Sequence, residues 1–333
     1  MEYRHLEQSG LKVSALSLGS WLTFGAQVDD DLTEQCMKVA YENGMNFFDN
    51  AEMYAGGKAE LAMGKAIKKL GWKRSSFVIS TKIFGGGSGV NEKGLSRKHL
   101  IEGTKACLAR LQLDYVDLIY AHRPDPDTPM EEIVRGFNYL IEKGFAFYWG
   151  TSEWSAEEIS EGHRVADRLG LIHPIMEQPE YNMFNREKVE KEYAPLYAKY
   201  GLGTTTYSPL DGGILSGKYN KDIPVGSRFS NKDSPMMKML AAGLEAPDGK
   251  EKIAKVERLM VIAEKLDVTV AQLALAWILK NPNVTTVITG ASKPSQVLEN
   301  VKAIAVVSKL TEEIVAEIEG ILNNKPERAL TFR

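Results

Sequence analysis

The sequence predicts an α/β fold, a closed (β/α)8 TIM barrel with an N-terminal β-hairpin and a long loop after the seventh strand. Short apolar runs rich in β-branched or aromatic residues alternate with longer stretches of helical periodicity, which is the pattern of successive βα units. Most successive strand ends lie roughly 27 to 40 residues apart, enough for one strand, one crossover helix and two short loops. Eight such units predict a closed barrel.

Eight runs have the character of buried barrel strands. They are Ala15 to Leu18, Met45 to Asp49, Phe77 to Thr81, Val116 to Tyr120, Phe147 to Gly150, Ile175 to Gln178, Gly203 to Tyr207, and Thr286 to Thr289. Two further runs, 3–6 and 11–13, flank Ser9 and Gly10 near the start of the chain. They predict a hairpin that closes one end of the barrel.

Helix starts support the crossover units. Ser96 precedes a helical run, and Ser155 stands three residues before Glu158 in a capping-box pattern.

The regular spacing of the βα units ends after the seventh strand, where residues 211–250 are rich in Gly, Pro, Asp and Ser. We expect this stretch to be a lid or a cofactor clasp. Helices are predicted beyond it at 253–266, 270–280 and 311–323, and the tail from Lys325 is expected to be loose.

Composition narrows the class of protein. A chain of 333 residues with 44% hydrophobic content can bury a large core, and we expect a single domain over residues 1–333. The net charge of -3 and the absence of a dense Lys/Arg run argue against nucleic acid as a partner. No run has the roughly 18 apolar residues of a membrane span, so direct membrane insertion is not expected. The two cysteines have no CxxC spacing, and we predict reduced thiols, a cytoplasmic location and no metal site.

Candidate catalytic residues follow three of the predicted strands. Asp49 ends one apolar run and Tyr54 follows it closely, while Lys82 and His122 stand at the ends of two others. Catalytic groups of a TIM barrel gather at the C-terminal ends of its strands. The sequence therefore predicts that these four side chains meet in one site.

The chemistry of these four residue types fits proton transfer. A free tyrosine has a pKa near 10, and we expect the ammonium of Lys82 to lower the pKa of Tyr54. The carboxylate of Asp49 would keep the buried ammonium of Lys82 protonated. Tyr54 would act as the proton donor, and His122 would orient a carbonyl oxygen.

Structural interpretations stand beside these roles. Taken singly, Asp49 fits a helix cap, Tyr54 a side chain packed under a loop, and Lys82 a solvated strand-end charge. A different catalytic alternative makes Lys82 the Schiff-base nucleophile of a barrel aldolase. The other histidines are expected to be structural, namely His5, His99, His163 and His173.

Several motifs resemble those of the aldo-keto reductase superfamily, and the likeness runs from Tyr3 to Lys325. Within it, the chain is most similar to the branch that contains potassium-channel β subunits. The motifs are Trp21-Leu-Thr-Phe-Gly, Ser80-Thr-Lys-Ile-Phe, Gly94-Leu-Ser-Arg-Lys-His, Arg123-Pro-Asp, Tyr148-Trp-Gly-Thr-Ser and Glu177-Gln-Pro-Glu-Tyr-Asn. The resemblance implies a TIM barrel that binds NADP(H) although the chain has no GxGxxG fingerprint. It also implies that Tyr54 protonates the carbonyl oxygen during hydride transfer.

The resemblance further implies a set of cofactor-binding residues. At the nicotinamide end they are Ser20, Trp21, Gln27, Asp49, Ser152, Gln178 and Tyr207. Ser152 and Gln178 would bind the carboxamide and Tyr207 would stack on the ring. Many members of the superfamily have Asn after the serine, whereas Glu153 stands here.

The remaining cofactor residues are implied for the phosphates and the adenosine. Those implied for the pyrophosphate are Ser208, Pro209, Leu210, Asp211, Gly212, Lys218 and Arg228. Those implied for the adenosine 2′-phosphate site are Gly290, Ser292, Gln296, Glu299 and Asn300. The likeness thus favours NADP over NAD.

Two functions follow from the resemblance. The first is an NADPH-dependent reductase that converts aldehydes and ketones to alcohols, with a small carbonyl compound as substrate. The second is an NADP(H)-binding regulatory β subunit with weak reductase activity, which implies a potassium channel as partner and is compatible with a homotetramer.

Overall fold

The computed structural model describes residues 1–6, 8–230 and 235–327, and it divides into two compact units. The first unit comprises residues 1–179, 192–207 and 283–301 and contains every strand of the barrel. The second comprises residues 180–191, 208–282 and 302–333. Each unit is described by itself.

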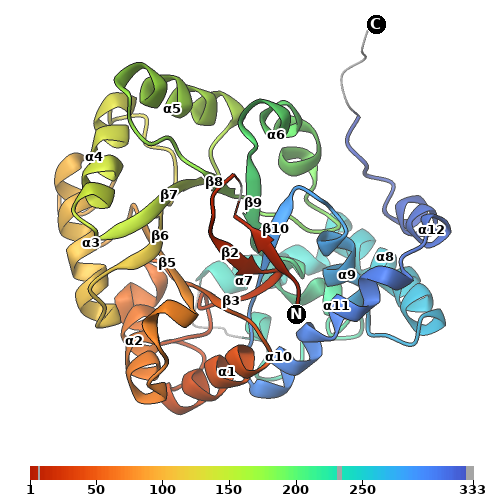
Figure 1. Cartoon of the computed structure of the whole chain (residues 1–333). Coiled ribbons are helices and arrows are strands. Elements are labelled where there is room, and N and C mark those ends of the chain that lie inside the picture. The colour runs from red at the N-terminus through yellow and green to blue at the C-terminus, as the bar shows by residue number, and fades with distance from the viewer. Residues whose placement is uncertain (7, 231–234, 328–333) are drawn as a thin grey trace, which may run out of the picture. The chain divides into compact units, whose positions relative to one another are not determined.

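Eight parallel strands close the barrel of the first unit in the order β10-β3-β4-β5-β6-β7-β8-β9 (Figure 1). The strands are β3 (Leu16–Gly19), β4 (Phe47–Asp49), β5 (Val78–Ile83), β6 (Val116–Ala121), β7 (Ala146–Ser152), β8 (Met176–Gln178), β9 (Gly203–Thr206) and β10 (Val284–Thr289). Parallel pairing of β9 with β10 and of β10 with β3 closes the ring. The predicted fold class and all eight strands are confirmed.

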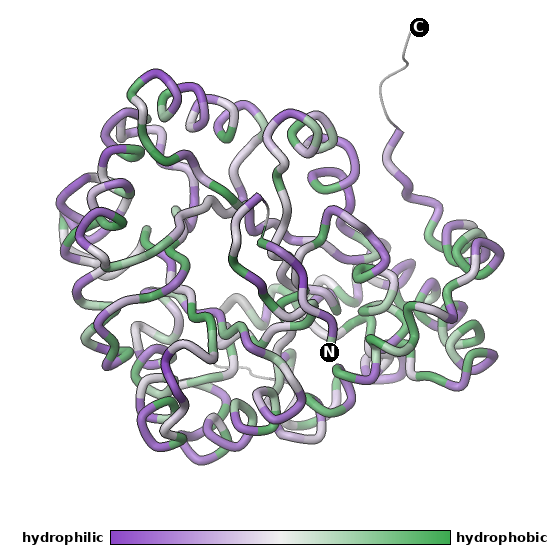
Figure 2. Tube along the Cα trace, viewed as in Figure 1, coloured by the Kyte–Doolittle hydropathy of each residue, from purple (hydrophilic) through white to green (hydrophobic). Residues whose placement is uncertain are grey.

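Helices cover the outside of this barrel. They are α1 (Asp30–Glu42), α2 (Lys58–Leu70), α3 (Arg97–Leu111), α4 (Met130–Glu142), α5 (Ala156–Leu169), α6 (Ala194–Tyr200) and α10 (Pro294–Val301). The two predicted caps are present, because Ser96 accepts from the His99 backbone N–H and Ser155 forms a complete capping box with Glu158. Hydrophilic and hydrophobic segments alternate along α4 and α5, as expected for helices with one face on a sheet (Figure 2).

The N-terminal hairpin is also confirmed. Strands β1 (Tyr3–His5) and β2 (Lys12–Ser14) pair antiparallel. Leu6 and Val13 are fully buried and share one cluster with side chains of the barrel strands, namely Phe47, Val78, Leu118, Tyr120 and Met176. The hairpin therefore packs on the apolar layer of the barrel interior.

Along each strand, the side chains that face the barrel interior change from apolar to polar. Side chains two residues apart on a strand point to the same face. Phe47 therefore shares its face with Asp49, and the same alternation relates Val78 to Ser80 and Lys82. His122 lies two residues after Tyr120 and four after Leu118, so it shares their face. The barrel interior is thus apolar toward the hairpin and polar at the C-terminal ends of its strands.

The second unit is mostly helical. Its helices are α7 (Pro235–Glu245), α8 (Pro247–Lys265), α9 (Val270–Leu279), α11 (Ala303–Val306) and α12 (Glu312–Leu322). Arg186 bonds to Glu190 and to Glu319 of α12, and its guanidinium lies 4.9 Å from the centre of the Trp277 ring on α9. These contacts bind the 180–191 segment to the helices of this unit.

The long loop after the seventh strand contains more structure than predicted. It contains 3₁₀ turns at Asp211–Ser216 and Arg228–Ser230, the whole of α7, and the first turn of α8. Helix α7 went unrecognised because flanking Gly, Pro and Asp residues dominate the local composition, although a Pro at the first helical position is itself a start signal. The expectation for the tail concerns residues 325–333, of which 328–333 lie outside the described residues.

Candidate active site

Lys82 is the centre of the candidate active site. It is the penultimate residue of strand β5, its side chain is fully buried, and all three of its ammonium protons have acceptors. Nζ donates to Asp49 Oδ2 at 2.6 Å, to the Asn50 carbonyl at 2.6 Å and to Tyr54 Oη at 3.1 Å. The ammonium therefore joins the carboxylate and the phenol in one hydrogen-bonded group.

The Asp49 carboxylate is held by side chains of two other strands, β5 and β8. Its Oδ1 accepts from Ser80 Oγ at 2.7 Å and from Gln178 Nε2 at 3.2 Å, while Oδ2 takes the lysine. Ser80 stands two residues before Lys82 and so points to the same face of β5. That spacing was the one signal in the sequence for this unpredicted partner.

His122 lies against the phenol of Tyr54. The two rings meet edge to face with centroids 5.7 Å apart, and Nδ1 of His122 is buried without a hydrogen-bond partner among the described residues. Burial lowers the pKa of His122 well below its usual value, and the charges of Lys82 and Arg123 act in the same direction. The imidazole is therefore neutral at neutral pH.

The pKa of Tyr54 differs from the sequence-based expectation. Burial raises it well above its usual value, the charge of Asp49 raises it further, and Arg123 opposes the rise. The predicted net lowering was wrong because burial and the charge of Asp49 outweigh the nearby cations, and burial also lowers the pKa of Lys82 itself. The phenol therefore retains its proton in the absence of other ligands, as a proton donor must.

A second hydrogen-bonded group holds the loop between Asp49 and Tyr54. Glu52 is buried, and its Oε1 accepts from the Phe84 backbone N–H at 2.6 Å and lies 3.0 Å from His99 Nε2. The Glu52 backbone N–H also donates to the Lys82 carbonyl. Glu52 and His99 thus fix the phenol-bearing loop to β5. His99 is structural, as expected, whereas the contribution of Glu52 was missed.

An aromatic wall stands beside the four-residue group. The ring centroid of Trp21 lies 6.5 Å from that of Tyr54 and 6.2 Å from that of Tyr207, which follows β9. Ser20 is buried and donates from Oγ to the Asp49 carbonyl, whereas Gln27 is exposed on the loop before α1. Flat apolar surface therefore adjoins the group that transfers protons.

The strand ends of β7 and β8 are linked by side chains. Ser152 Oγ donates to the Gln178 carbonyl at 2.9 Å, and the Gln178 amide donates to Asp49. Both predicted carboxamide-binding residues therefore lie in one hydrogen-bonded series with the catalytic candidates. The following residue, Glu153, has a positive φ of 62°, a conformation that Asn adopts more readily than Glu.

The predicted 2′-phosphate residues lie at the C-terminal side of β10. Gly290 and Ser292 precede α10, and Gln296, Glu299 and Asn300 lie on it. Gln296 Oε1 accepts from the Ser292 backbone N–H at 2.8 Å.

The predicted pyrophosphate residues lie in the second unit. Backbone φ is positive at Ser208, Asp211, Gly212 and Gly213, so the chain turns tightly here, and the N–H groups of Asp211 and Gly213 donate to the Ser208 and Leu210 carbonyls. A Cβ on Gly213 would lie 2.8 Å from Lys218 Nζ, so the ammonium lies against this loop.

Two cations of the second unit lie close together. Burial lowers the pKa of Lys218, and the nearby charge of Arg228 lowers it further. In the described residues no carboxylate forms an ion pair with either cation, whereas Asp211 pairs with Lys252 at 2.7 Å. A pair of cations without a counter-ion among the described residues is suited to binding an anion.

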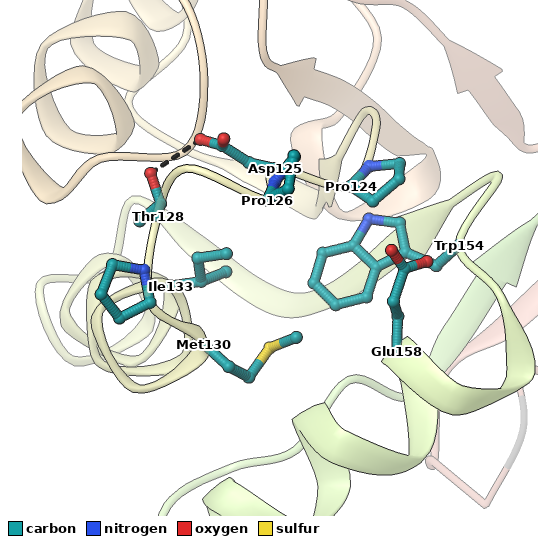
Figure 3. Close-up of a pocket in the computed structure, with 9 residues that line it drawn as sticks. Pro124, Asp125, Pro126, Thr128, Met130, Ile133, Trp154 and Glu158 are labelled. Carbon is teal, nitrogen blue, oxygen red and sulfur yellow. Dashed lines mark hydrogen bonds between the residues drawn. The ribbon is translucent and has the colours of Figure 1, made fainter.

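A separate pocket lies between the loop after His122 and helices α4 and α5 (Figure 3). Its volume is ≈ 290 Å³, and the indole of Trp154 projects into it. The lining residues are Pro124, Asp125, Pro126, Thr128, Pro129, Met130, Ile133, Trp154 and Glu158. None of the residues predicted to be catalytic or to bind a cofactor lines this pocket.

Two absences apply to the described part of the chain. Over residues 1–6, 8–230 and 235–327, no helix has the length and apolar character needed to cross a membrane. In the same ranges, no cluster of three or more His, Cys, Asp or Glu side chains is arranged to hold a metal ion.

Comparison with known proteins agrees with this geometry. The model of the aldo/keto reductase family matches residues 15–323. A probable voltage-gated potassium channel subunit beta from Arabidopsis thaliana is 55% identical over 334 residues, covering 100% of both chains. Its counterpart from Oryza sativa subsp. japonica is 52% identical with the same coverage. A putative voltage-gated potassium channel subunit beta from Schizosaccharomyces pombe is 54% identical over 97% of this chain and 94% of its own. The chain therefore belongs to the aldo/keto reductase family, whose members are oxidoreductases that use a nicotinamide nucleotide.

Proposed function

We propose that the protein reduces aldehydes and ketones to alcohols with NADPH. The observation that carries this proposal is the buried group in which Lys82 bonds to both Asp49 and Tyr54 while a neutral His122 faces the phenol. A protonated phenol and a neutral imidazole are the two groups that a carbonyl oxygen needs during reduction. We propose for these four residues the roles predicted from the sequence.

The residues divide the work as follows. Tyr54 donates its proton to the carbonyl oxygen, Lys82 stabilises the phenolate that remains, and Asp49 holds the ammonium in place. The His122 ring donates a hydrogen bond to the carbonyl oxygen and so orients it. The bound nucleotide supplies the hydride to the carbonyl carbon. One C–H and one O–H bond form, and the C=O double bond becomes a single bond.

The proposed cofactor residues are suited to a dinucleotide. Trp21 and Tyr207 offer flat surface for a nicotinamide ring, with Ser20, Ser152 and Gln178 near Asp49. Gln27 is proposed to contribute from the adjoining loop. In the second unit, the 208–213 backbone with Lys218 and Arg228 is proposed to bind phosphate. For the adenosine 2′-phosphate we propose the residues around α10, namely Gly290, Ser292, Gln296, Glu299 and Asn300.

Substitution of Tyr54 by Phe tests the catalytic role. The ring is retained but the proton is lost, so kcat for aldehyde reduction should fall about 10²–10⁴-fold while NADPH binding changes little. NADPH oxidation and NADPH fluorescence titration measure the two quantities. Tyr41→Phe is the matched control, because the Tyr41 hydroxyl bonds to Ser76 outside the site. A Tyr54→Phe variant with undiminished turnover would eliminate the proposed acid.

The names of the three relatives favour one further candidate, a regulatory β subunit of a potassium channel. For this candidate we further propose a cytoplasmic location and assembly as a homotetramer. Co-sedimentation with a purified voltage-gated potassium channel, together with light scattering of the protein alone, tests this candidate. A monomer that fails to bind the channel would leave only the reductase. The single-domain prediction likewise remains a proposal.

A further inference from the structure

Arg123 follows His122 directly at the C-terminal end of β6 and is not part of the predicted catalytic group. Its Nη1 donates to the His122 carbonyl and to Ser152 Oγ, the latter at 3.3 Å, so the side chain reaches across to the end of β7. Ser152 bonds in turn to the Gln178 carbonyl, and the Gln178 amide bonds to Asp49. Arg123 therefore joins the same polar rim as the catalytic candidates.

The charge of Arg123 has no partner of opposite sign in the described part of the chain. Asp125 is the nearest carboxylate in sequence, but it accepts from the Leu95 backbone N–H, from Thr128 Oγ1 and from the Asp127 backbone N–H. Asp49 is engaged by Lys82. A guanidinium has five N–H donors, and among the described residues only Nη1 of Arg123 has an acceptor. The half-buried group thus retains both its charge and a free edge.

The field of this cation reaches the catalytic groups. Its charge contributes to the lowered pKa values of His122 and Lys82 and opposes the rise in the pKa of Tyr54. An excess positive charge close to the reacting groups favours ligands that bring a negative charge.

We propose that Arg123 binds a carboxylate on the substrate, so that the enzyme prefers oxo acids, in which a carboxylate lies close to the carbonyl group, over neutral aldehydes and ketones. The free edge of a guanidinium matches the two oxygens of a carboxylate. Because Arg123 adjoins His122, the carboxylate and the carbonyl of such a substrate are close together. This inference rests on the proposed reductase function.

A matched pair of substrates tests the specificity. Phenylglyoxylate and its methyl ester share the ring and the ketone, and they differ in the charge of the neighbouring group. In Arg123→Met, the ratio of kcat/KM for the acid to that for the ester should fall at least tenfold, since a hydrogen bond between charged groups contributes about 1.5–3 kcal/mol. Arg123→Lys should retain part of the ratio. Arg164→Met is the control for removal of an exposed cation.

The outcomes separate the possible roles. An equal loss on both substrates would make Arg123 a positioning residue for the strand ends and overturn the proposal, and so would a ratio that stays within twofold of wild type. If the wild-type protein reduces neither substrate, the reductase function fails instead. Calorimetric titration with benzoate, which has no ketone, then still decides the anion site, because binding that is equal in wild type and Arg123→Met contradicts it.

Discussion

The candidate catalytic residues were predictable because they lie at the ends of apolar runs. Asp49 ends β4, Lys82 is the penultimate residue of β5 and His122 directly follows β6, and strand parity places all three on the face that begins with buried apolar side chains. Their second partners were not predictable. Gln178 reaches Asp49 from 129 positions away, and only barrel closure brings them together. The direction of the pKa shift of Tyr54 depends on burial, which the local sequence does not contain.

At the same scale, Arg228 provides a test of cofactor selectivity. It is half-buried beside Lys218 without a carboxylate partner in the described residues. Beyond its proposed contribution at the pyrophosphate, we expect its charge to act on the adenosine 2′-phosphate, so removal of this charge should weaken NADPH more than NADH. For Arg228→Ala we expect the dissociation constant of NADPH to rise about 10-fold to 100-fold, and that of NADH to rise less. Fluorescence titration measures both, with the exposed Arg258→Ala of the same unit as control. Equal losses for the two nucleotides would argue against a contact with the 2′-phosphate.

Whole elements differ in how clearly the sequence marks them. Strands β5, β6 and β10 are buried along their whole length and are rich in β-branched or aromatic residues, so the sequence marks them clearly as strands. Capping residues located the starts of α3 and α5 because their side chains satisfy free backbone N–H groups. Helix α7 begins at a proline within a segment rich in turn residues. The Gly, Pro and Asp content of that segment predicts a loop, and the helical spacing of its few apolar residues is too short to indicate a helix.

The packing of α5 against α6 predicts a pH dependence of stability. His163 on α5 is buried between His173 and Tyr200, with ring centroids at 4.5 and 4.0 Å. Burial lowers its pKa to about 3, with smaller contributions from the charges of His173 and Lys199. The unfolded chain binds a proton here below pH 6.5 and the folded chain does not, so stability is full above pH 6.5 and falls as the pH falls toward 3.

We therefore expect the free energy of unfolding of the wild-type protein to fall by about 1–2 kcal/mol between pH 7 and pH 5 because of His163. The variant His163→Phe retains an aromatic ring for stacking but cannot bind a proton, so its stability should depend less on pH over this interval. Urea denaturation at several pH values measures the difference. Parallel pH profiles for the two proteins would show that His163 does not titrate differently on folding.

The whole chain is organised in a way that its sequence did not reveal. Both compact units are built from separated segments, because residues 180–191 leave the first unit and residues 192–207 and 283–301 return to it. Alternating βα units predict the barrel, but they do not indicate that an interval of about 80 residues between its last two strands builds a unit of its own. That division depends on contacts between positions far apart in the chain.

We predict that cooperative folding of the barrel requires its last strand, β10. Strand β10 pairs with both β9 and β3, and its side chains are all buried. A chain that ends at Pro282 lacks β10 and leaves two strand edges with unpaired N–H and C=O groups, each costly to bury. We expect this chain to lose near-UV circular dichroism and cooperative melting, whereas a chain that ends at Glu327 keeps every described element and should melt within about 2 °C of wild type. Cooperative melting of the shorter chain would mean that seven strands suffice, and the positions of Ser20 and Asp49 would then not depend on a closed ring.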